Sequence, residues 1–239
     1  MKHIALIIAG GVGNRMGQDI PKQFINVYDK PVIIYTLEAF QKHPKIDEIY
    51  VVCLEGWHDI LRAYAKQFGI TKLVKVLNGG ASAQESIRNG VYAIGETASD
   101  DDIVVIHDGV RPLVEDIVLS DVLVKCEEFG NAVTSMPYNE QIFKIKDEYT
   151  TTEYVPRDTV RRVSTPQAYK MGKLMWAYKK AFSENIGISP SSYTNTMMVD
   201  LGETLYFAAG SDKNIKLTTK DNLEMFKAFL NMEKDSWIK

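Results

Sequence analysis

The sequence predicts an α/β fold: a Rossmann-like, mostly parallel sheet with helices on both faces and a projecting β-arm. Short apolar runs of strand length alternate with segments of helical period, and this alternation predicts a parallel sheet covered by helices. The strand-like runs are nearly continuous in apolar residues, as strands buried on both faces are. One stretch, at about 137–163, departs from this pattern and predicts the arm. We expect residues 1–239 to form a single domain.

Strands and helices are predicted in turn through the first 130 residues. The N-terminal apolar run is a strand and not a signal peptide, because it spans only about six residues and ends in glycines. Pro31 favours a helix start for the second element. In chain order the predicted elements are strand His3–Ile8, helix Val32–Phe40, strand Glu48–Cys53, helix His58–Phe68, strand Leu73–Leu77, helix Ala83–Ile94, strand Ile103–Ile106 and helix Val114–Phe129.

The β-arm is predicted after about residue 136. Gln141–Lys146 and Thr150–Val155 alternate like strands, and a hairpin around Lys146–Glu148 would join them. A two-stranded arm cannot bury its own faces, so we expect it to pack on a second copy and form a homodimer. The α/β pattern then resumes with helix Lys173–Ser183, strand Leu205–Ala209 and helix Lys220–Met232.

Composition excludes several classes of protein. The net charge of -3 does not mark the whole chain as a nucleic-acid binder, so we expect no nucleic-acid partner. No stretch approaches the roughly 20 apolar residues of a membrane span, so we expect no membrane contact and a cytoplasmic location. Cys53 and Cys126 do not suggest a disulfide framework, and no Cys/His cluster has the spacing of zinc ligands.

A glycine-rich loop, AGGVGNRM at Ala9–Met16, follows the first strand. Free amides at such a junction favour phosphate. The dinucleotide fingerprint would need a glycine where Met16 stands, and a closing G-K-[ST] of the Walker A loop is absent. Arg15 in the loop and Lys22 in the following IPKQF suit a polyphosphate. A purely structural turn with two solvated charges remains the alternative.

A second polar segment, HDGVRP at His107–Pro112, follows the fourth strand of the α/β pattern. Ligands of open α/β sheets bind outside the carboxyl ends of the strands, which places Asp108 and Arg111 where a ligand is expected. The alternative is a turn with an internal salt bridge between these two residues.

The loop AGGVGNRM followed by PKQF resembles the signature of the methylerythritol-phosphate and ribitol-phosphate cytidylyltransferases. HDGVRP, the Gly79-Gly80 turn with Ser86, the Thr165-Pro166-Gln167 segment and NIKLT at Asn214–Thr218 resemble further segments of that family, in the same order. The resemblance covers nearly the whole chain. It implies transfer of CMP from CTP to a small sugar-alcohol phosphate, with release of pyrophosphate.

The resemblance also implies roles for individual residues. The loop residues would wrap the CTP triphosphate, Ser86 would contact the cytosine–ribose end, and Thr165 would belong to a T-P-Q turn. Four cations would act on the reacting phosphates, with Arg157 reaching across the dimer to the acceptor phosphate. The implied sites are catalytic Arg15, Lys22, Lys216 and Arg157; nucleotide-binding Ala9, Gly10, Gly11, Gly13, Gly80 and Ser86; and substrate-binding Asp108, Arg111, Thr165 and Thr194.

Three positions depart from the family pattern. Ala83 stands where the family usually has an arginine, Asn195 follows Thr194 in place of an aspartate, and Gln141 takes the place of a threonine on the arm. The last two lie near the alcohol end of the implied site. They favour a ribitol-type or other polyol phosphate and leave methylerythritol phosphate open.

The implied reaction needs no general base, because a phosphate oxygen of the acceptor is already anionic at neutral pH. Mg²⁺ would be held mainly by CTP oxygens and water, with no direct protein ligand expected. Two alternatives remain open at this stage. One is a nucleotidyltransferase that uses another sugar phosphate or another nucleotide, and the other is a nucleotide-binding protein without turnover.

Overall fold

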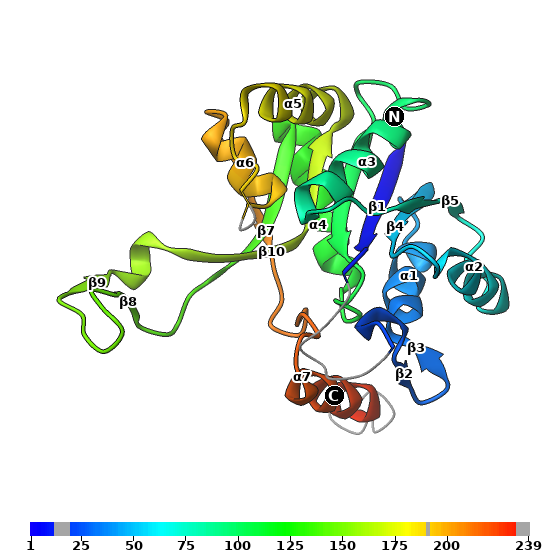
Figure 1. Cartoon of the computed structure of the whole chain (residues 1–239), viewed down its shortest axis with the longest axis horizontal. Coiled ribbons are helices and arrows are strands. Elements are labelled where there is room, and N and C mark those ends of the chain that lie inside the picture. The colour runs from blue at the N-terminus through cyan, green and yellow to red at the C-terminus, as the bar shows by residue number, and fades with distance from the viewer. Residues whose placement is uncertain (12–19, 190–191, 233–239) are drawn as a thin grey trace.

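The computed structural model describes residues 1–11, 20–189 and 192–232. Within them, a seven-stranded sheet has the order β11-β7-β10-β6-β1-β4-β5 (Figure 1). Its strands are β1 (His3–Ala9), β4 (Glu48–Cys53), β5 (Leu73–Asn78), β6 (Ile103–Asp108), β7 (Asn131–Pro137), β10 (Arg161–Lys170) and β11 (Phe207–Ala209). The helices are α1 (Val32–Lys42), α2 (His58–Gln67), α3 (Ala83–Gly95), α4 (Asp116–Phe129), α5 (Met171–Glu184), α6 (Thr194–Asp200) and α7 (Lys220–Met232).

The strand pairing confirms the predicted mostly parallel sheet. β1 lies between β6 and β4, and β4 pairs with β5, all in parallel. The register aligns Ala9 with Cys53, and Ile8 with Asp108, so these strands end together at one edge. β10 is the exception, because it runs antiparallel to both β6 and β7.

Helices cover both faces of the sheet, as predicted. Alternate residues of β1 belong to two different apolar clusters, because successive side chains of a strand point to opposite faces. Ala5, Ile7 and Ala9 pack in the cluster that contains residues of α1, α2 and α4. Ile4 and Leu6 pack in the cluster that contains residues of α3, α5 and α6. All five side chains are buried, which leaves function to the ends of the strands.

A third, smaller cluster closes the carboxyl edge of the sheet. The hairpin of β2 (Asn26–Val27) and β3 (Lys30–Pro31) packs there with α7, and the shared core contains Val27, Leu217 and Phe226. The backbone amide of Leu217 donates to the carbonyl of Val110, at 2.9 Å. The NIKLT segment is therefore tied to the loop that follows β6.

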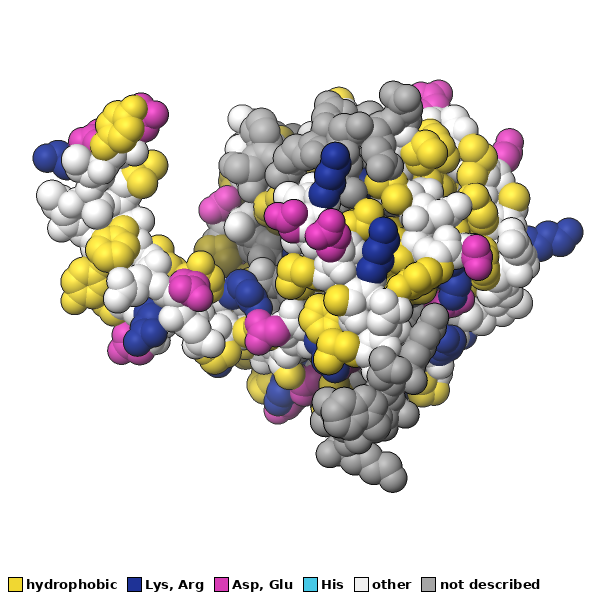
Figure 2. All heavy atoms as spheres, turned by 90° about the horizontal axis from the view of Figure 1, so that it is seen from below, with side chains coloured by type: hydrophobic (Ala, Val, Ile, Leu, Met, Phe, Trp, Pro, Cys, Tyr) yellow, Lys and Arg dark blue, Asp and Glu magenta, His cyan; other side chains and the backbone are white. Residues whose placement is uncertain are grey.

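The projecting arm is present at residues 138–160, with strands β8 (Ile142–Lys144) and β9 (Glu153–Val155). Figures 1 and 2 show it standing away from the body, with hydrophobic side chains along it. Ile145 and Tyr149 are 89% and 86% exposed. The strands are shorter than predicted because the chain turns from Ile145 onward, where the amide of Lys146 donates to the carbonyl of Thr150.

The prediction of a T-P-Q turn at Thr165–Gln167 is wrong. These residues lie inside β10, which pairs with β7 up to Ser164 and again from Gln167. Pro166 has no N–H to donate to the ladder, and the register shifts between Ser164 and Gln167. The segment is thus an irregularity within a strand, and it keeps Thr165 beside the end of β6.

Cys53 and Cys126 are buried free thiols, and burial raises their pKa to about 11 and about 12, respectively. In the described part of the chain, no helix has both the length and the apolar character needed to cross a membrane.

Candidate active site

A cleft of about 470 Å³ opens at the carboxyl ends of β1 and β6. It brings together segments that are far apart in the sequence. Ten of the residues predicted for the site line it: Ala9, Gly10, Gly11, Lys22, Gly80, Ser86, Asp108, Thr165, Thr194 and Lys216. Arg15 and Gly13 lie outside the described residues. A hollow of about 520 Å³ at the outer edge strand β11 contains none of the predicted site residues.

Lys22 belongs to a short 3-10 turn, Lys22–Phe24, that follows Pro21. Gln23 fixes this turn to the glycine loop: its buried side-chain amide donates to the carbonyls of Ala9, at 2.7 Å, and Gly11, at 3.1 Å. Phe24 stacks on Trp57 with ring centroids 4.5 Å apart. The turn that carries Lys22 is therefore held by the glycine loop through Gln23 and by Trp57 through Phe24. Our sequence analysis missed Gln23, although it lies within the PKQF motif.

Ser86 shapes the second glycine turn. Its hydroxyl accepts from the amide of Gly80, at 3.0 Å, and donates to the carbonyl of Ser82, at 2.9 Å. Ser86 is not the cap of the helix that follows this turn, because Ser82 is the N-cap of α3 and accepts from the amide of Glu85. Ser86 instead holds the turn from inside the first turn of the helix. Ala83, one of the three positions that depart from the pattern the sequence resembles, also lines the cleft.

Replacing Gly80 with alanine should weaken binding of CTP, the nucleotide that the sequence resemblance implies, about tenfold. A Cβ at this position would lie 2.3 Å from Glu85 Cβ and 3.0 Å from the Glu85 backbone carbon, so the turn must shift. Such overpacking typically costs about 1–3 kcal/mol. Isothermal titration with CTP measures the effect. Ser86→Ala removes the hydrogen bond to the Gly80 amide but introduces no clash, so it should weaken binding less. Unchanged affinity in Gly80→Ala would contradict this account.

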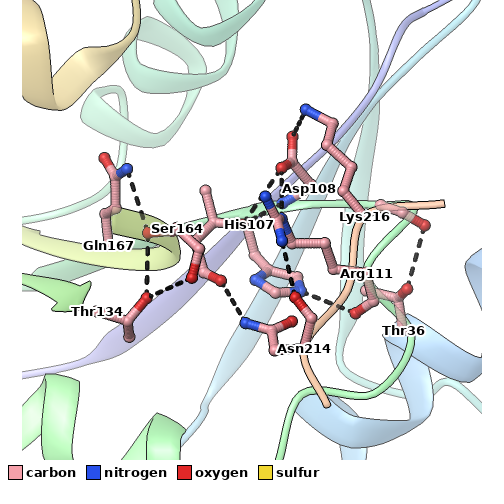
Figure 3. Close-up of polar contacts among 11 residues, drawn as sticks. Thr36, His107, Asp108, Arg111, Thr134, Ser164, Gln167, Asn214 and Lys216 are labelled. Carbon is pink, nitrogen blue, oxygen red and sulfur yellow. Dashed lines mark hydrogen bonds and ion pairs between the residues drawn. The ribbon is translucent and has the colours of Figure 1, made fainter. Parts of the chain in front are cut away.

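Asp108 is the electrostatic centre of the cleft (Figure 3). Arg111 donates to it through Nε at 2.9 Å, and Lys216 through Nζ at 3.0 Å. Burial alone would raise the pKa of Asp108, but the two cations and their hydrogen bonds outweigh burial and lower the pKa to about 2. The carboxylate is therefore charged throughout the neutral range.

The internal salt bridge considered for HDGVRP is thus present, and it changes the roles assigned to its members. Arg111 does not line the cleft. Its guanidinium donates to Asp108 and also to the carbonyl of Asn214, the latter at 2.7 Å. Asp108 is engaged by two cations, so it orients Lys216 in addition to facing the cleft. Asn214 also donates to the carbonyl of Thr165, at 2.6 Å, and Thr165 Oγ1 accepts from the amide of Asp108.

His107 is a buried side chain that lies beside this centre. Its Nε2 must donate to the carbonyl of Arg111, at 3.1 Å, because a carbonyl only accepts. Nδ1 is then unprotonated, and it has no partner among the described residues. The ring is fully buried, and burial lowers its pKa to about 4.

This pKa predicts a pH dependence of stability. A histidine held neutral in the fold contributes stability above its unfolded pKa, about 6.5, and that contribution is lost as the pH falls towards about 4. The loss is on the order of 3 kcal/mol. Urea unfolding at pH 7, 6, 5 and 4.5 should show it, and His107→Gln should flatten the curve. Parallel curves for the two proteins would refute the assignment.

Two cleft residues on the remaining wall come from the start of α6. Thr194 is buried, and its hydroxyl contacts the hydroxyl of Tyr178, at 2.8 Å. Tyr193, which the sequence did not single out, is half-exposed, and its ring centroid lies 5.9 Å from Lys216 Nζ. Asn195 follows, and its buried Oδ1 has no partner among the described residues.

Arg157 lies apart from the cleft of its own chain. It sits on the arm in a 3-10 turn, Arg157–Thr159, and donates to the carbonyl of Asn139, at 3.0 Å. Gln141 and Arg157 line a separate hollow of about 330 Å³ on the arm.

The chain is similar to known cytidylyltransferases over almost its whole length. Residues 3–232 match the family described as 2-C-methyl-D-erythritol 4-phosphate cytidylyltransferase. The ribitol-5-phosphate cytidylyltransferase of Lacticaseibacillus paracasei is 62% identical over 226 residues, which cover 95% of this chain and 97% of that protein. The 2-C-methyl-D-erythritol 4-phosphate cytidylyltransferase of Clostridium tetani is 35% identical over 97% of this chain and 93% of its own. The fold matches the 4-diphosphocytidyl-2C-methyl-D-erythritol synthase of Anaerococcus prevotii, with a TM-score of 0.81 at 21% identity over 96% of each chain.

Proposed function

The chain belongs to the 2-C-methyl-D-erythritol 4-phosphate cytidylyltransferase family, and on that basis we propose that it transfers CMP from CTP to ribitol 5-phosphate. Membership of this family makes the chain a cytidylyltransferase for a sugar-alcohol phosphate. The choice of acceptor rests on the 62% identity with a ribitol-5-phosphate enzyme, against 35% with a methylerythritol-phosphate enzyme. Gln141 and Asn195, which depart from the methylerythritol pattern, support the same choice.

The reaction is a displacement at phosphorus. A phosphate oxygen of the acceptor attacks the α-phosphorus of CTP, the bond from that phosphorus to the bridging oxygen of the β-phosphate breaks, and pyrophosphate leaves with the electron pair. The demand is electrostatic, because two polyanions meet and charge grows on the leaving group. Lys22 and Lys216 are the cations of the described cleft that would meet this demand.

Mg²⁺ is proposed to enter with CTP and not through a protein cage. Among the described residues lining the cleft, Asp108 is the only carboxylate, and two cations already engage it. In the described part of the chain, no group of three or more His, Cys, Asp or Glu residues could hold a metal ion. These residues fit a metal that keeps phosphate and water ligands and neutralises charge on the triphosphate. Chelation by EDTA should abolish turnover, and added Mg²⁺ should restore it.

The arm is proposed to pair two copies and to carry Arg157 to the partner's cleft. The exposed apolar side chains of the arm support this arrangement, since a two-stranded hairpin cannot bury them itself. Mixing Lys22→Ala with Arg157→Ala tests it. If each cleft uses Lys22 of one copy and Arg157 of the other, mixed dimers contain one intact site and regain activity. Absence of any regain after subunit exchange, verified by native mass spectrometry, would count against the arrangement.

The proposed acceptor is tested by measuring pyrophosphate release. CTP, UTP, GTP and ATP are each assayed with ribitol 5-phosphate and with 2-C-methyl-D-erythritol 4-phosphate. We expect turnover with CTP and ribitol 5-phosphate to exceed every other pair by at least about 100-fold in kcat/KM, which is well within the discrimination of a site that reads hydroxyls by hydrogen bonding. Preference for methylerythritol phosphate would overturn the proposed acceptor. Binding of CTP without pyrophosphate release would argue against an enzyme.

A further inference from the structure

A buried chain of hydrogen bonds joins the start of α3, which follows the Gly79-Gly80 turn, to the wall of the cleft formed by α6. Tyr178 of α5 has no exposed surface and lies between Gln84, in the first turn of α3, and Thr194, the first residue of α6. Its hydroxyl is 2.9 Å from Gln84 Oε1 and 2.8 Å from Thr194 Oγ1. Gln84 and Thr194 are each 1% exposed, so the hydrogen bonds that they make with Tyr178 are shielded from bulk water.

The direction of each hydrogen bond in this chain can be deduced. The side-chain nitrogen of Gln84 donates to the carbonyl of Gly187, at 3.2 Å, which turns its oxygen towards Tyr178. An amide oxygen only accepts, so Tyr178 donates its single proton to Gln84. Burial raises the pKa of Tyr178 well above its usual value, so the phenol keeps that proton. The 2.8 Å contact then requires Thr194 to donate to the Tyr178 oxygen.

This direction determines what Thr194 can offer a ligand. Its hydroxyl has one proton, and that proton is committed to Tyr178. The oxygen keeps only lone pairs. Such an oxygen binds a group that donates, such as a hydroxyl of a sugar alcohol, and repels a phosphate oxygen, which carries no proton to give. Thr194 lines the cleft beside Tyr193, so this polarity is set at the surface where substrate binds.

We propose that Tyr178 and Gln84 are positioning residues that hold Thr194 as an acceptor-only group, which selects a hydroxyl of the sugar-alcohol phosphate. This inference rests on the proposed function and deepens it, because it assigns Thr194 to the alcohol part of the acceptor and not to its phosphate. Gln84 lies two residues before Ser86, so the same chain also fixes α6 relative to the glycine turn that Ser86 holds.

The first test is Tyr178→Phe, which removes the hydroxyl and keeps the ring. Thr194 is then released to rotate, and the KM for the acceptor should rise about tenfold, the effect of one lost hydrogen bond. The KM for CTP and kcat should stay within about twofold, because the cations of the cleft are untouched. A distortion of the whole cleft would instead raise both KM values and lower kcat.

The second test uses acceptor analogues that each lack one hydroxyl. The wild-type protein should discriminate against one of them by about tenfold or more, and Tyr178→Phe should shrink that factor towards one. Gln84→Met should also shrink the discrimination factor, because Tyr178 can then donate its proton to Thr194. This variant provides the measurement if Tyr178→Phe folds poorly. An unchanged discrimination pattern in both variants would overturn the proposal.

Tyr35→Phe is the matched control. The Tyr35 hydroxyl donates to the carbonyl of Val27, at 2.8 Å, and Tyr35 does not line the cleft, so both KM values should be unchanged. The analogues are derived from whichever acceptor the wild-type protein turns over. A protein that prefers methylerythritol phosphate would disprove the proposed acceptor, while the response of Tyr178→Phe would still decide the role of the buried chain.

Discussion

Replacing Lys216 with methionine is expected to lower kcat at least about 100-fold, the scale seen when one positioned charge-stabilising group is removed from an active site. The Lys216 side chain is 31% exposed and lies in the cleft, 3.0 Å from Asp108. Its backbone is held by Leu217, which is buried and bonded to Val110. Because its position is already fixed, Lys216 loses little conformational entropy when it binds the developing charge on the phosphates.

The substitution also changes the balance of charge around Asp108. Lys216 is the larger of the two cationic influences that lower the pKa of Asp108, and Arg111 is the other. Without Lys216 the pKa of Asp108 should rise, and the remaining carboxylate should repel CTP more strongly. We therefore expect the KM for CTP to rise as well as kcat to fall.

Lys213→Met is the control for Lys216→Met. Lys213 lies three residues earlier in the same segment, but it is 59% exposed and pairs with Glu115 outside the cleft. It should keep turnover within about twofold of the wild-type value, as surface substitutions usually do. Steady-state kinetics with both substrates provide the comparison. Equal effects of the two substitutions would mean that Lys216 acts only on stability.

The parallel half of the fold could be predicted because its strands are almost purely apolar. β1, β4 and β6 are buried along nearly their whole length, so periodicity and composition agree. β7 was missed because its sequence, NAVTSMP, includes polar residues that are nonetheless buried. Asn131 donates to the carbonyl of Thr204, and Thr134 bonds to Ser164, so both are satisfied by partners that lie far away in the sequence.

β10 and α6 were missed for different reasons. β10 begins with Arg161 and Arg162 and contains Pro166, all of which argue against a strand in the middle of a sheet. The register shift around Pro166 accommodates the missing N–H. α6 has only seven residues, which is too short for helical periodicity to be recognised.

The members of the site could be predicted, but their partners could not. Motif similarity selected Lys216 and Asp108, whereas their ion pair spans 108 residues and depends on the fold. Gln23 and Tyr178 were overlooked because a buried polar side chain is recognised only through its partner atoms. The sequence left open whether Asp108 and Arg111 both bind a ligand or pair with each other, and the structure shows the pair.

Lys22→Ala should be at least as damaging as Lys216→Met, with kcat/KM for CTP reduced by about 100-fold or more. Lys22 lines the cleft from a turn that Gln23 and the Phe24–Trp57 stack hold in place. That support brings the ammonium to the glycine loop, where the triphosphate is proposed to bind. Arginine at this position should restore only part of the activity, because a planar guanidinium does not replace a compact ammonium held at one point.

Lys30→Ala separates this effect from a loss of stability. Lys30 lies eight residues further on, pairs with Glu38 at 2.7 Å and does not line the cleft. Its loss should lower the melting temperature slightly and leave kcat/KM within about twofold. The two variants are compared by pyrophosphate release and by thermal unfolding in the same buffer. Because Lys22→Ala removes a charge that acts on the reacting phosphates, its activity should fall while its melting temperature stays close to that of the wild-type protein. Near-normal turnover would remove Lys22 from the reaction and leave Lys216 as the only described cation lining the cleft that could act on the triphosphate.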